Sequence, residues 1–414
     1  MAAPEVITFG CRLNIYESEV IKAHSQAASL HDVIIFNTCA VTAEAERQAR
    51  QAIRKARREN PHKKIIVTGC SAQITPQIYA QMPEVDQVIG NTEKMQISTY
   101  ASEQPRTISV SDIMAKTTVE SHVISSFEAK TRAYVQIQNG CDHRCTFCTI
   151  PYGRGNSRSV PMGVLFDQIA KFMEQDIQEI VLTGVDITSY GHDLPGTPTL
   201  GQILRRLLHH FPTLARLRLS SVDPVEIDDD VFHVLATESR FMPHLHISLQ
   251  AGDDLILKRM KRRHLRHHLL LFCERARKAR PEVTFGADII AGFPTEKEDH
   301  FRNTLNIIRD CDLTFSHIFP YSPRPGTPAS RMPQVQRTII KDRARQLREE
   351  AKRLQREHFQ RYVGTTQEVL VEKDGKGRTP HFIPVFFSPS LSIGQIVPLK
   401  CLSATDQGLR GELV

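Results

Sequence analysis

Three cysteines that lie close together in the sequence form the pattern with the clearest chemistry. Cys141, Cys145 and Cys148 have the spacing CxxxCxxC and follow the apolar stretch 132–137. A structural zinc site uses four protein ligands, whereas an iron–sulfur cluster held by three cysteines leaves one iron open to a further ligand. The alternatives are three buried thiols or a zinc site with a distant fourth ligand. The compact spacing favours an iron–sulfur cluster with an open iron.

A second set of cysteines follows three short β-branched runs near the amino terminus. Cys11, Cys39 and Cys70 each end such a run, and the helical stretches 17–29 and 42–59 separate the runs. Alternating strands and helices predict a parallel sheet whose carboxyl edge collects the strand ends, so the three thiols should converge. The alternative for each is a small buried hydrophobic residue. We interpret the remaining thiols as packing residues: Cys273, Cys311 and Cys401.

Length and composition indicate a protein of two or three domains. The chain has 414 residues, which is too long for one compact core. No apolar stretch approaches the roughly 18 residues that a membrane span needs, and the amino terminus lacks the layout of a secretion signal. We therefore expect a cytoplasmic protein without a membrane partner. In that reducing setting the nine cysteines should serve as metal ligands and packing residues rather than disulfides.

The positive charge is unevenly distributed. The formal net charge is +7, and Lys and Arg concentrate in the segments 251–280, 42–59 and 337–361. A single charged helix is more often a solvated surface, but three such segments favour a polyanionic partner, most simply RNA or DNA. We expect Arg262 and Arg263 in the first segment to contact phosphates.

Beyond the cysteine loop the chain repeats a strand, a polar turn and an amphipathic helix. Six such units predict a partial parallel barrel with its functional loops at the carboxyl ends of the strands. The expected strands span 132–138, 179–183, 216–220, 244–250, 284–290 and 314–320, and the helices span 162–175, 200–210, 226–237, 265–280 and 296–310.

The fourth strand of this barrel alternates strictly between polar and apolar residues. His244, His246, Ser248 and Gln250 should share one face, which we expect to point into the barrel. Buried polar groups are costly unless they meet a ligand or one another, so this face forms a ligand site or an internal polar network. Asp288 on the next strand extends the same argument.

The carboxyl-terminal residues change character near residue 363. Short strands at 366–372, 382–387, 395–400 and 408–412, separated by turns, predict a small β-barrel. Residues 98–131 have no clear period and are interpreted as a linker. The predicted fold class is α/β, with an amino-terminal parallel sheet domain, a partial (β/α)6 barrel and the small β-barrel.

The cysteine loop, with Phe147 before its last cysteine at the start of a six-unit barrel, resembles the radical S-adenosylmethionine (SAM) superfamily. The fuller set of motifs resembles its methylthiotransferase branch, and the terminal module resembles the RNA-binding TRAM domain through residues 378–385. The matching segments are 8–19, 37–42, 67–70, 140–151, 288–294 and 319–327. By this resemblance the domains span 1–97, 98–131 (linker), 132–350 (radical SAM) and 351–414 (connecting helix and TRAM-like module).

The resemblance also implies two cofactors. Cys141, Cys145 and Cys148 would hold a [4Fe-4S] cluster that binds SAM, and Cys11, Cys39 and Cys70 would hold a second [4Fe-4S] cluster that delivers the sulfur. No side chain beyond these ligands is needed as a catalytic base. Around SAM the resemblance places Phe147, Thr183, Gly184, Asp186, Ser248 and Gln250.

Within the family, the motifs 10–14 and 16–18 are most similar to enzymes that methylthiolate N6-threonylcarbamoyladenosine (t6A) beside the tRNA anticodon. Sibling enzymes act on isopentenyladenosine in tRNA or on an aspartate of a ribosomal protein. The t6A carboxylate would need a cation, for which Arg12 and Arg324 are candidates. The implied partners are the tRNA anticodon stem-loop and an electron donor such as flavodoxin or ferredoxin.

Two hypotheses from other classes of protein remain. A non-catalytic, metal-containing RNA-binding protein explains the basic segments and the β module but not the polar barrel interior. An electron carrier explains two clusters but needs neither a barrel nor an RNA module.

Overall fold

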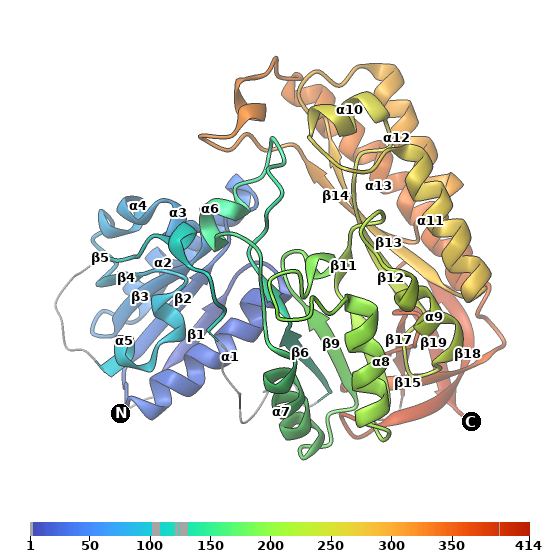
Figure 1. Cartoon of the computed structure of the whole chain (residues 1–414), viewed down its shortest axis with the longest axis horizontal. Coiled ribbons are helices and arrows are strands. Elements are labelled where there is room, and N and C mark those ends of the chain that lie inside the picture. The colour runs from blue at the N-terminus through green and yellow to red at the C-terminus, as the bar shows by residue number, and fades with distance from the viewer. Residues whose placement is uncertain (1–2, 102–107, 121–123, 125–130, 389) are drawn as a thin grey trace.

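The computed structural model describes residues 3–101, 108–120, 124, 131–388 and 390–414. Figure 1 shows three parts: an amino-terminal sheet with helices on both faces, a central curved sheet with helices along its outer side, and a small carboxyl-terminal β-barrel. This arrangement confirms the α/β class and the order of parts expected from the sequence. Among the described residues, no helix is long and apolar enough to cross a membrane.

The amino-terminal sheet is parallel and has the strand order β1-β2-β3-β4-β5. Separate apolar clusters cover its two faces, one against α1 and one against α2. Its strands are β1 (Glu5–Thr8), β2 (Val33–Thr38), β3 (Lys64–Gly69), β4 (Gln87–Ile89) and β5 (Ile108–Ser109). Its helices are α1 (Arg12–Ala27), α2 (Ala43–Glu59), α3 (Cys70–Ile74), α4 (Pro76–Ala80), the 3-10 helix η1 (Glu93–Met95) and α5 (Ile97–Ala101).

Helix α1 begins directly after Cys11, earlier than the sequence suggested. The side chain of Asn14 does not cap the helix but donates to the backbone oxygens of Phe9 (2.6 Å) and Thr38 (3.2 Å). The start of the helix lacks the usual capping signal because its N-cap residue is Cys11, and the side chain of Asn14 ties the cysteine loops together instead.

The central part is an arc of parallel strands. β6 (Arg132–Gln136), β9 (Glu179–Thr183) and β10 (Arg216–Leu219) form one sheet, and β11 (Ser221–Val222), β12 (His244–Gln250), β13 (Thr284–Ala291) and β14 (Phe315–Pro320) form the next. Since β11 follows β10 after one residue, the two sheets continue one another. No ladder among the described residues joins β6 to β14, so the barrel is partial, as the sequence predicted.

Helices cover the outer side of this arc and enclose the largest apolar core of the described chain. They are α7 (Met162–Met173), α8 (Leu200–His210), α9 (Asp229–Thr237), α10 (Asp254–Arg259), α11 (Arg266–Ala279), α12 (Glu298–Asp310) and α13 (Arg337–Gln360). The cysteine loop lies between β7 (Gln138–Asn139) and α6 (Ile150–Arg154), and β7 pairs with β8 (Arg158–Ser159). The remaining 3-10 helices are η2 (Ile113–Ala115), η3 (Ile187–Ser189) and η4 (Pro328–Arg331).

The carboxyl-terminal strands close into a barrel with the order β15-β16-β17-β19-β18. They are β15 (Thr366–Lys373), β16 (Lys376–Arg378), β17 (Pro384–Phe387), β18 (Ile396–Thr405) and β19 (Gly408–Leu413). The sequence predicted four of them and missed β16, because its first two residues, Lys376 and Gly377, were interpreted as part of the turn 373–377.

This small barrel lies against the amino-terminal ends of the central strands. Arg216 donates to the backbone oxygen of Glu368 (2.7 Å), and Arg218 donates to that of Pro380 (3.1 Å). Phe382, in a left-handed backbone conformation (φ 70°), stacks on His244 with ring centroids 5.0 Å apart. The aromatic ring of Phe382 thus forms the floor of the central barrel.

The predicted domain limits stay predictions. Helix α13 crosses the limit at 350, and β5 and η2 lie inside the expected linker 98–131. Residues 102–107, 121–123 and 125–130 of that linker lie outside the described residues.

Candidate active site

The two cysteine sets face one another across the boundary between the amino-terminal sheet and the central barrel. Gly153 of α6 lies against Cys70: a Cβ on this glycine would approach the Cβ of Cys70 to 3.3 Å. Thr149, just after the CxxxCxxC triplet, donates a long hydrogen bond (3.5 Å) to the backbone oxygen of Ala40, just after Cys39. The loop that carries one set of thiols therefore packs directly on the loops that carry the other.

A cavity of about 320 Å³ lies between the two sets. Cys11 lines it from one side and Phe147 from the other, and Arg154 also borders it. Its volume falls in the range of about 300–1,000 Å³ that is usual for small-molecule sites. The strand ends of the central barrel complete the lining with Gly184, Ser221, Ser248, Gln250, Ile290, Phe319 and Tyr321.

The amino-terminal set is built by a tight approach of three loops. Gly10 has φ +103°, and a Cβ there would lie 2.8 Å from the Cβ and 3.0 Å from the Sγ of Cys39. Only glycine fits this position, because a side chain would displace the neighbouring thiol. The backbone N–H of Val41 donates to the Sγ of Cys39 (3.5 Å), and the amide of Asn91 lies 3.9 Å from the Sγ of Cys70.

Burial raises the pKa of two of the thiols, Cys39 in this set and Cys148 in the CxxxCxxC set, to about 12, so both stay protonated in the absence of a metal. A metal ligand must be a thiolate, so the bound cation has to provide the charge that deprotonates them.

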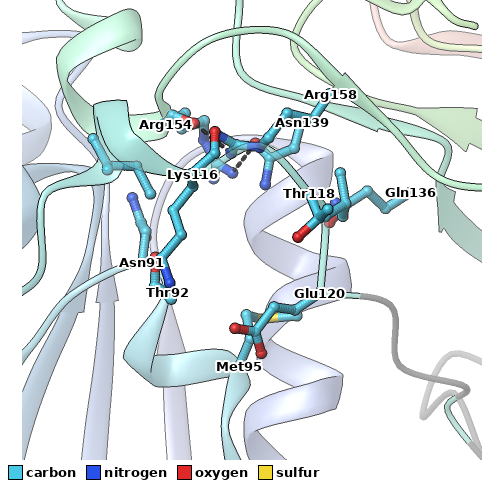
Figure 2. Close-up of a pocket in the computed structure, with 12 residues that line it drawn as sticks. Asn91, Thr92, Met95, Lys116, Thr118, Glu120, Gln136, Asn139, Arg154 and Arg158 are labelled. Atoms are coloured by element: carbon cyan, nitrogen blue, oxygen red, sulfur yellow. Dashed lines mark hydrogen bonds between the residues drawn. The ribbon is translucent and has the colours of Figure 1, made fainter. Parts of the chain in front are cut away.

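Arg154 is a buried cation next to the amino-terminal set. It contacts Glu17 through both guanidinium Nη atoms (2.8 and 3.0 Å), and Lys94 contacts the other side of this carboxylate (2.6 Å). Burial raises the pKa of Glu17, but the two cations outweigh burial and lower it to about 2. Figure 2 shows Arg154 hydrogen-bonded to Asn139 (3.1 Å) beside a second, much smaller pocket of about 30 Å³. This pocket has room for a single water molecule rather than a cofactor.

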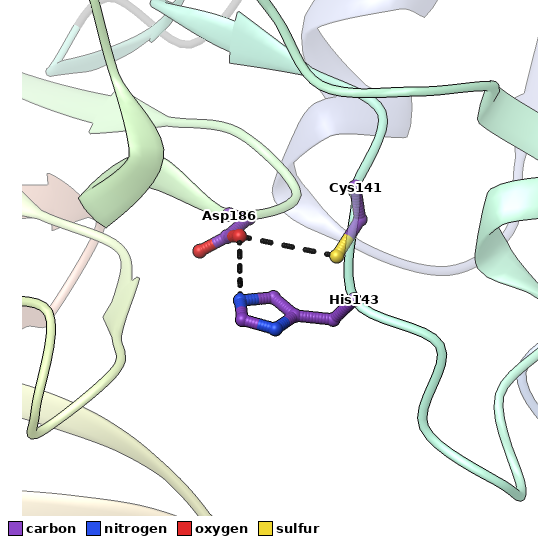
Figure 3. A group of neighbouring side chains, drawn as sticks. All are labelled: Cys141, His143 and Asp186. Carbon is purple, nitrogen blue, oxygen red and sulfur yellow. Dashed lines mark hydrogen bonds and ion pairs between the residues drawn. The ribbon is translucent and has the colours of Figure 1, made fainter. Parts of the chain in front are cut away.

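A polar cluster stands beside the first cysteine of the triplet, as Figure 3 shows. His143 Nε2 lies 3.1 Å from Asp186 and 3.2 Å from Glu226, and the Sγ of Cys141 lies 3.9 Å from Asp186. Hydrogen bonds to the two carboxylates raise the pKa of His143 to about 10. Burial raises the pKa of Asp186, yet the hydrogen bond from His143 leaves it below its ordinary value. The carboxylate of Asp186 is therefore ionised and fixed in place at the cavity's edge.

Arg262 does not have the role expected from the sequence. Its side chain is 9% exposed and donates to Asp223 (2.8 Å) and to the backbone oxygen of Ser248 (2.7 Å). Its other Nη lies 3.6 Å from the Sγ of Cys145. The prediction of a phosphate contact is wrong for Arg262, because a cation held among these groups cannot reach RNA. Arg263 is exposed and pairs with Glu226.

Other cations of the basic segments are also paired within the protein. Arg266 pairs with Asp310 and Arg275 with Asp229. Several arginines of α2 and α13 pair with acids on the same helix or nearby: Arg47 with Glu44, Arg57 with Asp86, Arg345 with Glu349 and Arg353 with Glu357. The clustering of charge along the sequence therefore overstated the positive charge that is available to an RNA.

The structure brings together most residues that were expected to surround SAM. Phe147, Gly184, Ser248 and Gln250 line the cavity, and Asp186 stands at its edge. Thr183 is buried, and its backbone oxygen accepts from Ile137. The sequence missed His143, Asp223 and Arg154, although Arg154 follows the triplet within a few residues.

The two candidate substrate cations lie apart. Arg324 is 7% exposed and pairs with Glu46 of α2, so it joins the two larger parts of the chain. Arg12 lies inside the central barrel with its guanidinium carbon 5.8 Å from the ring centre of Phe382. Unlike Arg324, Arg12 has no carboxylate partner among the described residues.

The fold and the site define a radical SAM protein with two flanking modules. The radical SAM superfamily model matches residues 135–308, the model of the uncharacterized protein family UPF0004 matches residues 4–90, and the TRAM domain model matches residues 360–414. The first two matches contain the two cysteine sets, one each.

Curated relatives match over nearly the entire chain. A threonylcarbamoyladenosine tRNA methylthiotransferase of Rickettsia prowazekii is 54% identical over 99% of this chain and 97% of its own. Its counterpart from Bacillus subtilis is 34% identical over 100% of this chain and 97% of its own. A tRNA-2-methylthio-N(6)-dimethylallyladenosine synthase of Erythrobacter litoralis is 31% identical over 99% and 96%. The chain belongs to the radical SAM tRNA methylthiotransferase family.

A solved structure supports the fold alone. The radical SAM methyltransferase TsrM of Kitasatospora setae, with tryptophan and a SAM analogue bound, has a TM-score of 0.54. It is 13% identical and covers 80% of this chain and 75% of its own.

The cofactors of the family, two [4Fe-4S] clusters and SAM, fit the residues present. All nine cysteines are free thiols; Cys11 of one set lines the cavity, and Phe147 brings the loop of the other set to it. Three thiolates per cluster leave one iron open, and the cavity is large enough for a small cofactor between them.

Replacement of Arg262 separates a role beside the cysteine triplet from a role in RNA binding. We expect Arg262→Gln to lower the rate of SAM cleavage about tenfold or more, because a charged hydrogen bond in a buried site contributes about 1.5–3 kcal/mol. Affinity for tRNA should stay unchanged. Activity assays and filter binding measure the two quantities, with Arg263→Gln as the matched control, which should retain SAM cleavage. A loss of tRNA affinity with normal SAM cleavage in Arg262→Gln would contradict this assignment.

Proposed function

We propose that this protein adds a methylthio group to C2 of N6-threonylcarbamoyladenosine next to the tRNA anticodon. The observation that carries the proposal is one cavity lined by Cys11 of the first cysteine set and by Phe147, which stands in the CxxxCxxC loop of the second. The C2–H bond of an adenine is too inert for acid–base catalysis by side chains. When bound, the clusters and SAM supply the carbon radical and the sulfur for this position.

In this proposal Cys141, Cys145 and Cys148 hold the cluster that binds SAM, and Cys11, Cys39 and Cys70 hold the second cluster. The chain's other residues position and shield these groups. Phe147, Gly184, Ser248 and Gln250 form walls of the SAM site, and His143 fixes the Asp186 carboxylate there. Arg262 places its guanidinium beside the Cys145 thiol and holds Asp223 and the β12 backbone in register. Thr183 is the buried last residue of β9 and positions Gly184, which follows it.

The choice of t6A is supported by the 54% identity to a relative that is named for this nucleoside. The second candidate substrate, isopentenyladenosine in tRNA, is supported by the relatives named for dimethylallyladenosine at 31% identity. A carboxylate on the substrate needs a cationic partner, and Arg12 inside the barrel is better placed than Arg324, which Glu46 already neutralises.

We further propose the anticodon stem-loop as the bound part of the tRNA, a flavodoxin or ferredoxin as the electron donor, and the cytoplasm as the location. An unstacked base of a loop can enter a cavity at lower cost than a base of a duplex. The TRAM domain match at 360–414 supports an RNA partner.

Mass spectrometry of tRNA nucleosides from cells that lack this protein tests the substrate. We expect 2-methylthio-N6-threonylcarbamoyladenosine to disappear and its unthiolated precursor to accumulate. The wild-type gene should restore the product, and a gene carrying Cys145→Ala should not. Loss of the isopentenyl analogue instead, or of a methylthio group from a ribosomal protein, would assign the protein to a sibling branch.

A further inference from the structure

The inward-facing residues of β12, β13 and β14 form layers across the inside of the central barrel. The layer near the carboxyl ends of the strands, Ser248, Ile290 and Phe319, lines the cavity between the cysteine sets. The next layer down consists of His246, Asp288 and His317, because inward positions recur every second residue along a strand. Asp288 and His317 are direct neighbours in the register of β13 and β14.

The three side chains of this layer are joined through one oxygen. Oδ1 of Asp288 lies 3.0 Å from His246 Nε2 and 3.1 Å from His317 Nδ1. Burial raises the pKa of Asp288, but the two histidine hydrogen bonds outweigh it and leave the pKa well below its ordinary value. An ionised carboxylate accepts from both rings, so the tautomer with a proton on Nδ1 is favoured at His317.

His317 differs from its partner in exposure. The side chain of His246 is 7% exposed, whereas that of His317 is 60% exposed. Asp288 engages Nδ1 of His317, and Nε2 has no hydrogen-bond partner among the described residues. The ring also meets Phe319 of the cavity wall edge to face, with centroids 6.5 Å apart. His317 therefore presents an oriented, unused polar atom close to the cavity.

Arg12 adds an unpaired cation near the same layer. It reaches into the barrel from the start of α1, directly after Cys11, and forms no hydrogen bond or ion pair with any described residue. Its side chain is half-buried. A partly desolvated guanidinium without a direct partner costs free energy, which an anionic ligand would offset.

A metal site is the other interpretation of two histidines and an aspartate whose ligand atoms lie within 4.8 Å of one another. The hydrogen-bond distances argue against it. Both histidines point at the same oxygen of Asp288 and are satisfied by it, which is the geometry of a hydrogen-bonded chain. The outer nitrogen of His317 and the guanidinium of Arg12 have no hydrogen-bond partner among the described residues, and both suit a polar, anionic organic group.

We propose that His317, oriented by Asp288, together with Arg12 recognises the polar substituent on N6 of the target adenosine. Arg12 pairs with the carboxylate of that substituent, and His317 hydrogen-bonds its hydroxyl or urea group. This inference rests on the proposed function and adds to it the residues that distinguish a polar, carboxylate-bearing substituent from an apolar one. His317 acts on substrate selection, not on the chemical step.

Binding of two RNAs to the cluster-loaded protein tests this inference. The RNAs are anticodon stem-loops of one sequence, with and without the threonylcarbamoyl group on the target adenosine. Wild-type protein should prefer the modified RNA by about tenfold or more, as expected for hydrogen bonds to a charged group. His317→Phe should remove most of this preference by weakening only the modified RNA. His317→Gln should retain part of it, because an amide can still bond to Asp288.

His233→Phe is the matched control, since His233 lies exposed on α9 away from the barrel interior and should keep the full preference. The visible absorption of the clusters checks that each variant is folded and loaded. If His317→Phe fails this check, Arg12→Gln provides the same comparison and should also lose the preference.

The outcomes distinguish the proposed t6A substrate from the proposed role of His317. Equal affinity of the wild-type protein for both RNAs would overturn the t6A assignment and this inference with it. A wild-type preference that persists in His317→Phe overturns this inference and leaves the proposed function intact. Equal weakening of both RNAs would make His317 a general RNA contact and also overturn its role in selection.

Discussion

Cys145→Ala should remove about half of the iron and abolish SAM cleavage, whereas Cys39→Ala should remove the other half and leave SAM cleavage measurable. Anaerobically reconstituted wild-type protein should contain about eight irons per chain, four in each cluster. The two sets belong to different parts of the chain and share no ligand, so the loss of a ligand from one set should leave the other cluster bound. Iron and sulfide analysis measures the first effect, and release of 5'-deoxyadenosine measures the second.

Cys401→Ala provides the matched control. Cys401 is fully buried in the carboxyl-terminal barrel, away from both sets, and its replacement should leave about eight irons and normal SAM cleavage. Formation of methylthiolated RNA should fail in both ligand variants. Zinc in place of iron, or product formation by Cys39→Ala, would refute the assignment of two clusters.

Glu17→Ala should destabilise the protein by about 3–5 kcal/mol, because it leaves the buried cations Arg154 and Lys94 without their shared carboxylate. All three side chains are at most 2% exposed, so water cannot replace the lost partner. Urea unfolding at neutral pH measures the change. Glu349→Gln, which breaks an exposed pair with Arg345 on α13, should have little effect.

The ion cluster of Glu17, Arg154 and Lys94 also predicts how the stability difference between wild type and Glu17→Ala depends on pH. Folding lowers the pKa of Glu17 from an ordinary 4.5 to about 2, so the full contribution of Glu17 to the free energy of unfolding is present above pH 4.5. This contribution is lost as the pH falls through the pKa of the folded state, because the carboxyl group is then protonated in both the folded and the unfolded state. The stability gap between wild type and Glu17→Ala should therefore narrow between pH 4.5 and about 2. A gap that widens towards acid would contradict the ion-pair explanation.

Much of the fold was predictable because its strands are short, β-branched and bounded by turns. The predicted limits of β9, β12 and α8 agree with the structure at both ends. The convergence of Cys11, Cys39 and Cys70 followed from one rule, that parallel strands end at the same edge of a sheet.

Residue roles that depend on distant partners were not predictable. Arg262 stands in a basic run, and nothing in the run shows that Asp223, 39 residues earlier, buries it beside Cys145. Arg154 and Glu17 are 137 residues apart in the sequence. Charge patterns along a chain report composition, whereas burial and pairing are decided by tertiary packing.

The position of Phe382 makes the two barrels interdependent. Its ring closes the floor of the central barrel, and the guanidinium carbons of Arg132, Arg218 and Arg378 lie 5.4, 5.0 and 4.2 Å from its centre. A fragment ending after α13 would open this floor to water and strip Arg216 and Arg218 of their carbonyl partners in the small barrel. Truncation would therefore measure the integrity of the catalytic interior as much as RNA binding. Substitutions on the outward-facing positions of β18 and β19 are the cleaner probe of what the small barrel contributes to an RNA complex.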